Sequence, residues 1–135
     1  MAVESGLNAG RKPKLSEEGT SGTYFLENHE RKKIAIFKPH DEEPFAPSNP
    51  RGYIGNLGGN GIRKGILSGE AATREVAAFL LDMNKFHKVP PTTYVEFYHP
   101  SFNYNELINS VPIKSGTQTN LKTLKTKHGS LQEFV

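Results

Sequence analysis

The sequence has no cysteine and no tryptophan, and no apolar run approaches the roughly 20 residues that a membrane-spanning helix needs. The absence of cysteine excludes disulfides, thiolate catalysis, zinc–thiolate sites and palmitoylation. The first 14 residues also lack the apolar core of a signal peptide, so we expect a cytoplasmic context. With 135 residues, 35% of them hydrophobic, and 13 glycines, the chain is expected to form one domain with a modest core.

The charge of the chain is mildly basic, with a net charge of +3 and a pI near 9.1. This balance suits phosphate-bearing partners, such as a nucleotide or an anionic membrane face. Because the charges are scattered and do not form blocks, nucleic-acid binding is not expected. The five histidines show no metal-ligand spacing, so no metal site is predicted.

The first half of the chain is predicted to contain a leader, a hairpin and a loop. Residues 1–14 are small, polar and aperiodic, which is typical of a disordered leader. Two apolar segments, 23–26 and 34–38, flank a short polar stretch, and this pattern predicts an antiparallel hairpin. Residues 46–67 are rich in glycine, proline and asparagine and favour a long loop.

A change of period at Ser68 predicts a helix over about residues 69–84, with Ser68 as its cap. Pro90 and Pro91 end any helical continuation. The residues at helical spacing are Ala72, Val76, Phe79, Leu80 and Met83. One face of this helix is therefore expected to pack on a sheet.

Two more strands are predicted near the end of the chain, over residues 92–97 and 130–135. Residues 105–128 are polar and are expected to form a connector, with one helical turn near residues 104–108. Antiparallel strands with one main covering helix define an α+β sheet domain.

A Gly-rich turn precedes the first predicted strand, and its members are Gly19, Thr20, Ser21, Gly22 and Thr23. Such a turn brings backbone N–H groups and hydroxyls close to a phosphate, although most isolated turns of this kind have no ligand. Lys38 ends an apolar strand, where its charge requires either solvent or an anion. Glu75 lies beside the apolar stripe of the helix and is either a surface acid or the partner of Lys38. The three features in this order point to phosphate positioning.

Two other patterns are weaker. Glu42 and Glu43 are adjacent carboxylates, and because neighbours diverge in an extended segment, they favour a solvated turn over a catalytic pair. Residues 58–61 read Gly-Gly-Asn-Gly, but no apolar strand precedes them, as a dinucleotide-binding loop requires.

Seven segments together resemble a known family. They read, in order, GTSGTYF, IAIFKPHDEEPF, SNPRG, GEAATREVAAFLLD, VPPT, SFNY and GSLQEFV. They resemble the kinase domain of type II phosphatidylinositol 4-kinases, above all the plant and protist branch known as gamma-type. The resemblance runs from about Leu15 to Val135, and FKPxxEEP is a highly specific part of it. It implies that residues 15–135 form a protein-kinase-like N-lobe.

The resemblance also implies roles for single residues. The Gly-rich turn over residues 19–23 would cover the phosphates of ATP, Lys38 would contact them, and Glu75 would orient the lysine. Ile36 would face the adenine. The strand that leads into the adenine-binding hinge would comprise Gln132, Glu133, Phe134 and Val135. A segment that shapes the phosphoinositide site would comprise Glu43, Pro44 and Phe45.

Two departures from the family pattern stand out. Animal members carry a cysteine-rich anchoring stretch after the EEP motif, whereas residues 46–67 contain no cysteine. Phosphoryl transfer also requires carboxylates for Mg²⁺ and for the attacking hydroxyl. The chain has only two aspartates, Asp41 and Asp82, and neither lies in a kinase catalytic or metal-binding motif. We therefore expect an N-lobe without its C-lobe, and no catalytic or metal-binding residue in this segment.

The expected function is that of the ATP-binding N-lobe of a phosphatidylinositol 4-kinase-like enzyme, inactive alone. In the full-length parent the partners would be Mg-ATP and phosphatidylinositol, at cytosolic membrane faces. Two alternatives remain open from the sequence. One is the N-lobe of a lipid-kinase-like Ser/Thr protein kinase, and the other is a non-catalytic interaction fragment.

Overall fold

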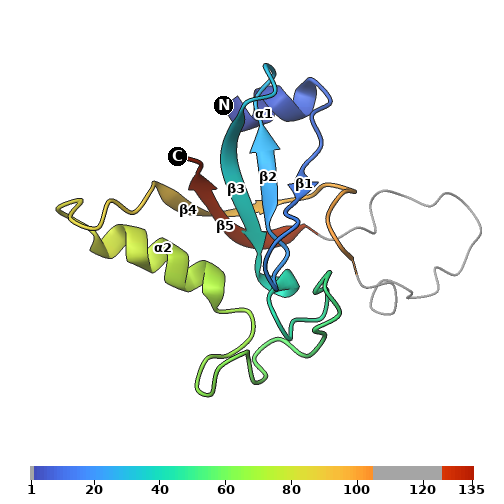
Figure 1. Ribbon diagram of the computed structural model, residues 1–135, viewed down its shortest axis with the longest axis vertical. Coiled ribbons are helices and arrows are strands. Elements are labelled where there is room, and N and C mark those ends of the chain that lie inside the picture. Colours follow the sequence, from blue (N-terminus) through green and yellow to red (C-terminus); the bar gives the residue numbers. More distant parts are fainter. Residues whose placement is uncertain (1, 105–125) are drawn as a thin grey trace, which may run out of the picture.

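A computed structural model describes residues 2–104 and 126–135 (Figure 1). Its elements are α1 (Ala2–Asn8), β1 (Lys14–Leu15), β2 (Tyr24–Glu27), β3 (Lys33–Pro39), the 3-10 helix η1 (His40–Glu42), α2 (Ala71–Leu81), β4 (Thr92–Phe97) and β5 (Lys127–Glu133). The five strands form one antiparallel sheet in the order β1-β2-β3-β5-β4. Helix α2 packs against β4 and β5. The predicted α+β class, with one main covering helix, is confirmed.

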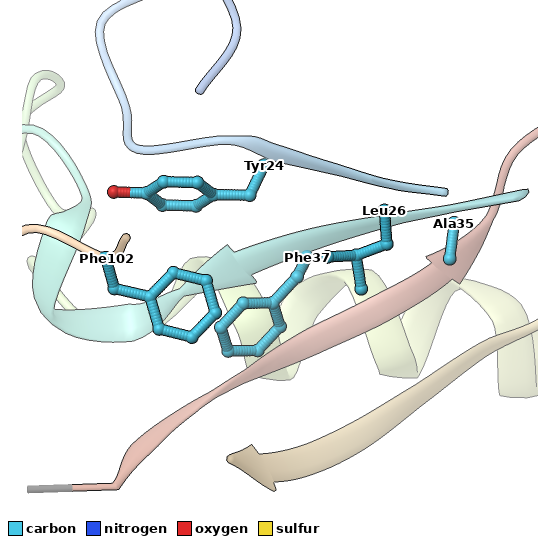
Figure 2. Packing of buried hydrophobic residues seen from close by; sticks show 5 residues of the cluster. All are labelled: Tyr24, Leu26, Ala35, Phe37 and Phe102. Atoms are coloured by element: carbon cyan, nitrogen blue, oxygen red, sulfur yellow. The ribbon is translucent and has the colours of Figure 1, made fainter. Parts of the chain in front are cut away.

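The sheet has two different faces because side chains alternate along each strand. In β3, Ala35 and Phe37 are buried, whereas Ile36 and Lys38 are half-buried on the opposite face. The buried face carries the core cluster, which is largely aromatic (Figure 2) and consists of Tyr24, Leu26, Ala35, Phe37 and Phe102. The ring of Phe102 lies 4.8 Å from that of Tyr24 and 5.1 Å from that of Phe37, between centroids. The core therefore lies on the sheet face opposite Lys38.

The predicted disordered leader is replaced by structure, since α1 covers residues 2–8 and β1 pairs with β2. Val3 packs against the core cluster. Gly6 is buried so closely that an added Cβ would lie 1.8 Å from the carbonyl oxygen of Glu27. A helix of seven residues is too short to be stable alone, so tertiary contacts hold it. Such contacts leave no periodic signal in the sequence.

Helix α2 is shorter than the predicted range of about 69–84, and its apolar stripe is only partly covered. Ala72 is buried, and Val76 and Phe79 are half-buried. By contrast, 65% of Leu80 and 85% of Met83 are exposed. The helix ends because the Asp82 carboxylate accepts the backbone N–H groups of residues 87 and 89, which turns the chain away.

The remaining elements agree broadly with the sequence. The hairpin of β2 and β3, the long loop over residues 46–67 and strand β4 are confirmed. Strand β5 begins three residues before the predicted 130–135 and ends at Glu133. The predicted helical turn near residues 104–108 and most of the predicted connector lie outside the described residues. None of the helices in the described ranges is long and apolar enough to cross a membrane.

Candidate nucleotide-binding site

Strand β3 and helix α2 bring Lys38 and Glu75 together, 37 residues apart in the sequence. The Lys38 Nζ atom lies 2.5 Å from Glu75 Oε1. The side chains are 33% and 27% exposed, so the pair is accessible to a ligand. The second Glu75 oxygen has no protein partner among the described residues. Lys38 is thus held by one carboxylate and keeps donor capacity for another anion.

The Gly-rich turn belongs to the loop that joins β1 to β2, and the loop is closed at its base by a hydrogen bond from Ser16 N to Thr23 O. Gly19 has a φ of 93°, a conformation that favours glycine. Gly22 donates its N–H to the carbonyl of Glu42 at 2.9 Å. An added Cβ at Gly22 would lie 1.9 Å from the Glu42 carboxylate, so no larger residue fits there. The two glycines therefore set the path of the loop.

The same loop is held from outside by Asn49 and Arg51. Asn49 is buried and donates to the carbonyl of Thr20 at 2.7 Å. The Arg51 guanidinium donates to the three carbonyls of residues 16–18. In contrast, the backbone N–H groups of residues 19–21 donate to no acceptor within the described ranges. Because its carbonyls are turned toward the protein, the loop leaves N–H donors for an anion.

Asn49 and Arg51 are functional candidates that the sequence reasoning missed. Their segment, SNPRG, is part of the family resemblance but predicts no role for either side chain. An Asn-Pro pair signals a turn, but it does not reveal which distant carbonyls the side chains reach.

Glu43 caps helix α2 across the long loop. Its carboxylate is buried and accepts the N–H of Gly69 at 2.7 Å and that of Ala71 at 2.9 Å. The prediction that Ser68 caps this helix is wrong. Gly69 turns the chain at a φ of 96°, and Ser68 Oγ is buried without a partner in the described structure. Burial raises the pKa of Glu43 although these N–H groups favour the carboxylate. Glu43 thereby anchors the helix that carries Glu75.

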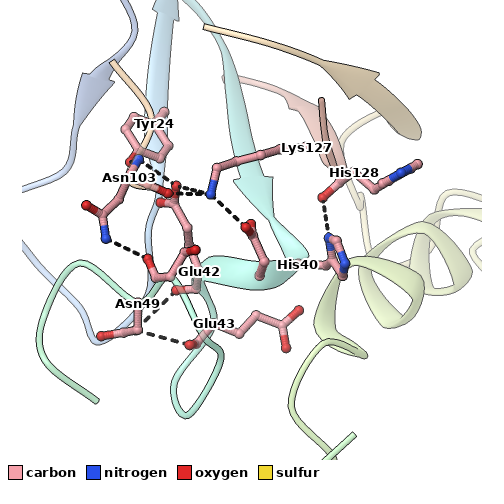
Figure 3. A network of polar contacts seen from close by, with 10 residues as sticks. Tyr24, His40, Glu42, Glu43, Asn49, Asn103, Lys127 and His128 are labelled. Atoms are coloured by element: carbon pink, nitrogen blue, oxygen red, sulfur yellow. Dashed lines mark hydrogen bonds and ion pairs between the residues drawn. The ribbon is translucent and has the colours of Figure 1, made fainter. Parts of the chain in front are cut away.

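Glu42 points the opposite way, into a buried cluster around Lys127 (Figure 3). Lys127 Nζ lies 2.8 Å from Asp41 Oδ2, 3.0 Å from Glu42 Oε1 and 2.5 Å from the carbonyl of Asn103. Its ammonium also lies 4.5 Å from the centre of the Tyr104 ring. The ammonium is thus surrounded by protein groups on several sides. This cluster was also missed, because Lys127 is 85 residues from Glu42 in the chain.

The predicted solvated turn at Glu42 and Glu43 is therefore wrong, since both residues are buried. The expected divergence of the two side chains is correct. Each carboxylate has its own distant partner, a lysine for Glu42 and a helix N-terminus for Glu43. Burial raises the pKa of Glu42, and the Lys127 ammonium offsets only part of this effect.

The residues assigned to the adenine edge lie along β3 and β5. Ile36 pairs with Gln132 and shares a sheet face with Lys38. Phe134 follows β5, donates its N–H to the carbonyl of Ile34, and packs its ring 5.8 Å from that of Phe25. Glu133 donates its N–H to the carbonyl of Pro91, and 92% of Val135 is exposed. Strand β5 thus leads from the lysine toward an open end of the sheet.

The rest of the predicted lipid segment forms a turn after Glu43. Phe45 has a φ of 64° and donates its N–H to the carbonyl of Tyr53 at 2.7 Å, and the two rings lie 6.1 Å apart. Pro44 precedes it and is half-buried. This turn is fixed by the same loop that supplies Asn49 and Arg51.

Both aspartates of the chain have structural roles. Asp41 pairs with Lys127, and the Asp82 carboxylate holds the turn after α2. The backbone N–H groups of residues 87 and 89 hold the pKa of Asp82 below its usual value. Among residues 2–104 and 126–135, no group of three or more acidic or histidine side chains is placed to hold a metal ion. The described residues therefore do not fit a Mg²⁺ site.

A five-stranded antiparallel sheet, a lysine–glutamate pair between strand and helix, and a Gly-rich loop over one sheet end define a kinase-like N-lobe. The family model for phosphatidylinositol 3- and 4-kinases matches residues 19–135. The chain therefore belongs to this phosphatidylinositol kinase family.

Curated relatives agree with this assignment. Phosphatidylinositol 4-kinase gamma 7 of Arabidopsis thaliana is 39% identical over 98% of this chain, and gamma 5 of the same plant is 40% identical over 99%. Phosphatidylinositol 4-kinase gamma 4 of Oryza sativa subsp. japonica is 39% identical over 76% of it. In each case the match spans only 20% of the relative's own length.

Proposed function

We propose that this chain is the ATP-binding N-lobe of a phosphatidylinositol 4-kinase-like enzyme. The single observation that supports the proposal most is the pair of Lys38 Nζ and Glu75 Oε1 at 2.5 Å. A half-exposed ammonium fixed by one carboxylate is suited to hold nucleotide phosphates. The Gly-rich loop adds the N–H groups of residues 19–21 on the other side of the phosphates.

Each part has a role in this proposal. Lys38 binds the phosphates, Glu75 orients it, and Asn49 with Arg51 keeps the loop carbonyls away from the anion. Ile36 lies beneath the adenine ring, and residues 132–135 lead to the hinge. Glu43, which caps α2, sets the position of Glu75 and with Pro44 and Phe45 borders the lipid site.

The parent reaction would transfer the γ-phosphoryl group of ATP to the 4-hydroxyl of phosphatidylinositol at a cytosolic membrane face. Enzymes of this family use ATP with a metal ion, and the metal would supply charge neutralisation at the phosphates. Both aspartates of this chain are engaged elsewhere, so the metal ligands and the base would come from a C-lobe. We therefore expect the chain to bind ATP without turning it over.

The first test is the binding of a fluorescent ATP analogue to the 135-residue chain. Lys38→Met is expected to weaken binding at least about tenfold, because a charge-assisted contact to phosphate is lost. Lys64→Met removes an exposed lysine of the long loop and is the matched control, with unchanged affinity expected. Equal affinity of the Lys38 and Lys64 variants would contradict the proposal.

The second test concerns turnover. The chain is incubated with radiolabelled ATP and phosphatidylinositol micelles, and no labelled lipid is expected. Labelled lipid that disappears in Lys38→Ala would show that the chain catalyses transfer by itself, and the expectation of inactivity would fail. The same assay on a longer parent, with a peptide as second acceptor, separates a lipid kinase from a Ser/Thr protein kinase.

A second candidate function is an interaction fragment, and the apolar surface after α2 favours it. A pocket of about 510 Å³ is lined partly by Met83, Val89 and Val135, and 82% of the neighbouring Phe86 is exposed. An exposed surface of this kind suits docking of a C-lobe or another partner. Sedimentation velocity tests whether this surface mediates self-association. A monomer at all concentrations argues against it.

A further inference from the structure

Positive charge is concentrated at the end of the sheet that lies away from Lys38. Strand β3 runs from Lys33, beside α1 and the β2–β3 turn, to Pro39, beside η1 (Figure 1). A hollow of about 280 Å³ lies at the α1 end and is lined by Gly10, Arg11, Lys12, Lys14, Glu27 and Arg31. We call it the basic hollow. It contains none of the residues assigned to ATP.

The backbone fixes both walls of the basic hollow. On one side, Arg11 donates its N–H to the carbonyl of Gly6, and Lys14 pairs with Phe25 in the sheet. On the other side, Asn28 Oδ1 accepts two N–H groups of the β2–β3 turn, and Arg31 donates its N–H to the carbonyl of Asn28. The hollow therefore exists before a ligand arrives, which lowers the entropy cost of binding.

The charges in the basic hollow do not balance. Four of its six lining residues are cationic, and Glu27 is its one acid. Glu27 is paired with Lys14 at 2.6 Å. Arg11 and Lys33 also act on this carboxylate, and together with Lys14 they hold its pKa below the usual value. Nearby, Glu30 lies 3.8 Å from His29 in the turn. An excess of positive charge remains on the hollow.

Arg11 provides independent support for an anion site. Its Nη2 donates to the carbonyl of His29 at 3.4 Å, but its Nε is buried and has no partner among the described residues. A buried guanidinium N–H without an acceptor is costly, and an oxyanion would satisfy it. Arg31 contributes a second guanidinium, and the fork geometry of this group suits phosphate.

We propose that the basic hollow is an anion site for a phosphate monoester, carried on the headgroup of a lipid. Its volume of about 280 Å³ lies just below the roughly 300–1,000 Å³ typical of ligand pockets, so it fits a headgroup and not a whole nucleotide. Binding there attaches the N-lobe to an anionic membrane through a surface separate from the nucleotide site. The site does not depend on the proposed function.

The test uses the 135-residue chain and phosphatidylcholine vesicles that contain phosphatidic acid, which presents a phosphate monoester. Vesicles with phosphatidylserine, adjusted to equal surface charge, lack that group. Co-sedimentation is expected to favour phosphatidic acid. Arg11→Gln/Arg31→Gln is expected to weaken this binding at least about tenfold, because two cations facing the membrane are removed.

The matched control is Arg63→Gln/Lys64→Gln, which removes the same charge from an exposed loop. It is expected to bind within about twofold of the unchanged chain. An equal loss in both double variants, or equal binding to the two anionic lipids, would overturn the proposal, since charge alone would then explain binding. Absence of binding to either vesicle would overturn it as well.

Two further measurements keep the result interpretable. Arg31→Gly removes one cation and places glycine at a position with a positive φ of 67°, so this variant is expected to stay folded. Weaker binding by it then reports the lost charge. Soluble glycerol 3-phosphate separates the sources of the ligand. Competition shows that the free headgroup suffices, and its absence shows that the lipid surface is required; the site is supported in both cases. ATP-analogue binding by the double variant, expected unchanged, separates this site from the proposed function.

Discussion

Lys38 and Lys127 lie on neighbouring antiparallel strands, yet their surroundings differ in nearly every respect. The Lys127 side chain is 2% exposed and contacts two carboxylates, a carbonyl and an aromatic ring. The Lys38 side chain is 33% exposed and contacts one carboxylate. The first lysine has little capacity left for a ligand, whereas the second is positioned but incompletely coordinated.

The difference shows how two lysines of one sheet acquire different tasks. A buried ammonium must have its charge compensated within the fold, so Lys127 joins β5, η1 and the Asn103 segment. A half-exposed ammonium is stabilised partly by water, which a phosphate can displace. The fold therefore depends on Lys127, and the proposed function depends on Lys38.

The largest expected effect comes from Lys127→Met. This variant leaves Glu42 buried without its cation, and loss of one partner of a buried pair costs about 3–5 kcal/mol of unfolding free energy. Urea unfolding followed by circular dichroism measures it, with Lys64→Met as an exposed control. Recovery of part of the loss in Lys127→Met/Glu42→Gln is expected. A loss no larger than that of the control would show that the cluster does not stabilise the fold.

A smaller, pH-dependent effect is expected from Glu42→Gln. The folded-state pKa of Glu42 is raised above its ordinary value of 4.5, chiefly by burial. Folding therefore favours the protonated form, and this residue's contribution is greatest below the unfolded pKa and falls as pH rises through the folded pKa. Unfolding free energies from pH 4 upward are expected to fall more steeply for the unchanged chain than for the variant. Parallel curves would contradict the raised pKa.

The smallest effect on stability is expected at Lys38. Its pair with Glu75 is partly exposed, and pairs of this kind contribute about 0–1 kcal/mol. Lys38→Met should therefore change the urea midpoint little while weakening ATP-analogue binding. A loss of stability as large as that of Lys127→Met would remove the distinction between the two lysines.

Much of the fold could be predicted from local patterns. The alternation in β3 and the helical spacing before Pro90 depend on neighbouring residues. The sequence therefore predicts strand β3 and helix α2 with small errors in where they begin and end. The errors lie where distant partners decide. Helix α1 depends on the core and on the backbone of Glu27, and the cap of α2 comes from Glu43 and not from the adjacent Ser68.

The sequence by itself determined the family and the α+β class, because these follow from motifs in a fixed order and from local periodicity. It left Glu75 as either a surface acid or the partner of Lys38, and the structure decided for the pair. Only the tertiary structure decided the burial of Glu42 and Glu43 and the basic hollow. The same is true of the hydrogen bonds from Asn49 and Arg51 to carbonyls of the Gly-rich loop. These features join residues far apart in the chain. The energy of a charge depends on its solvent exposure and its partners, and neither is written in its local sequence.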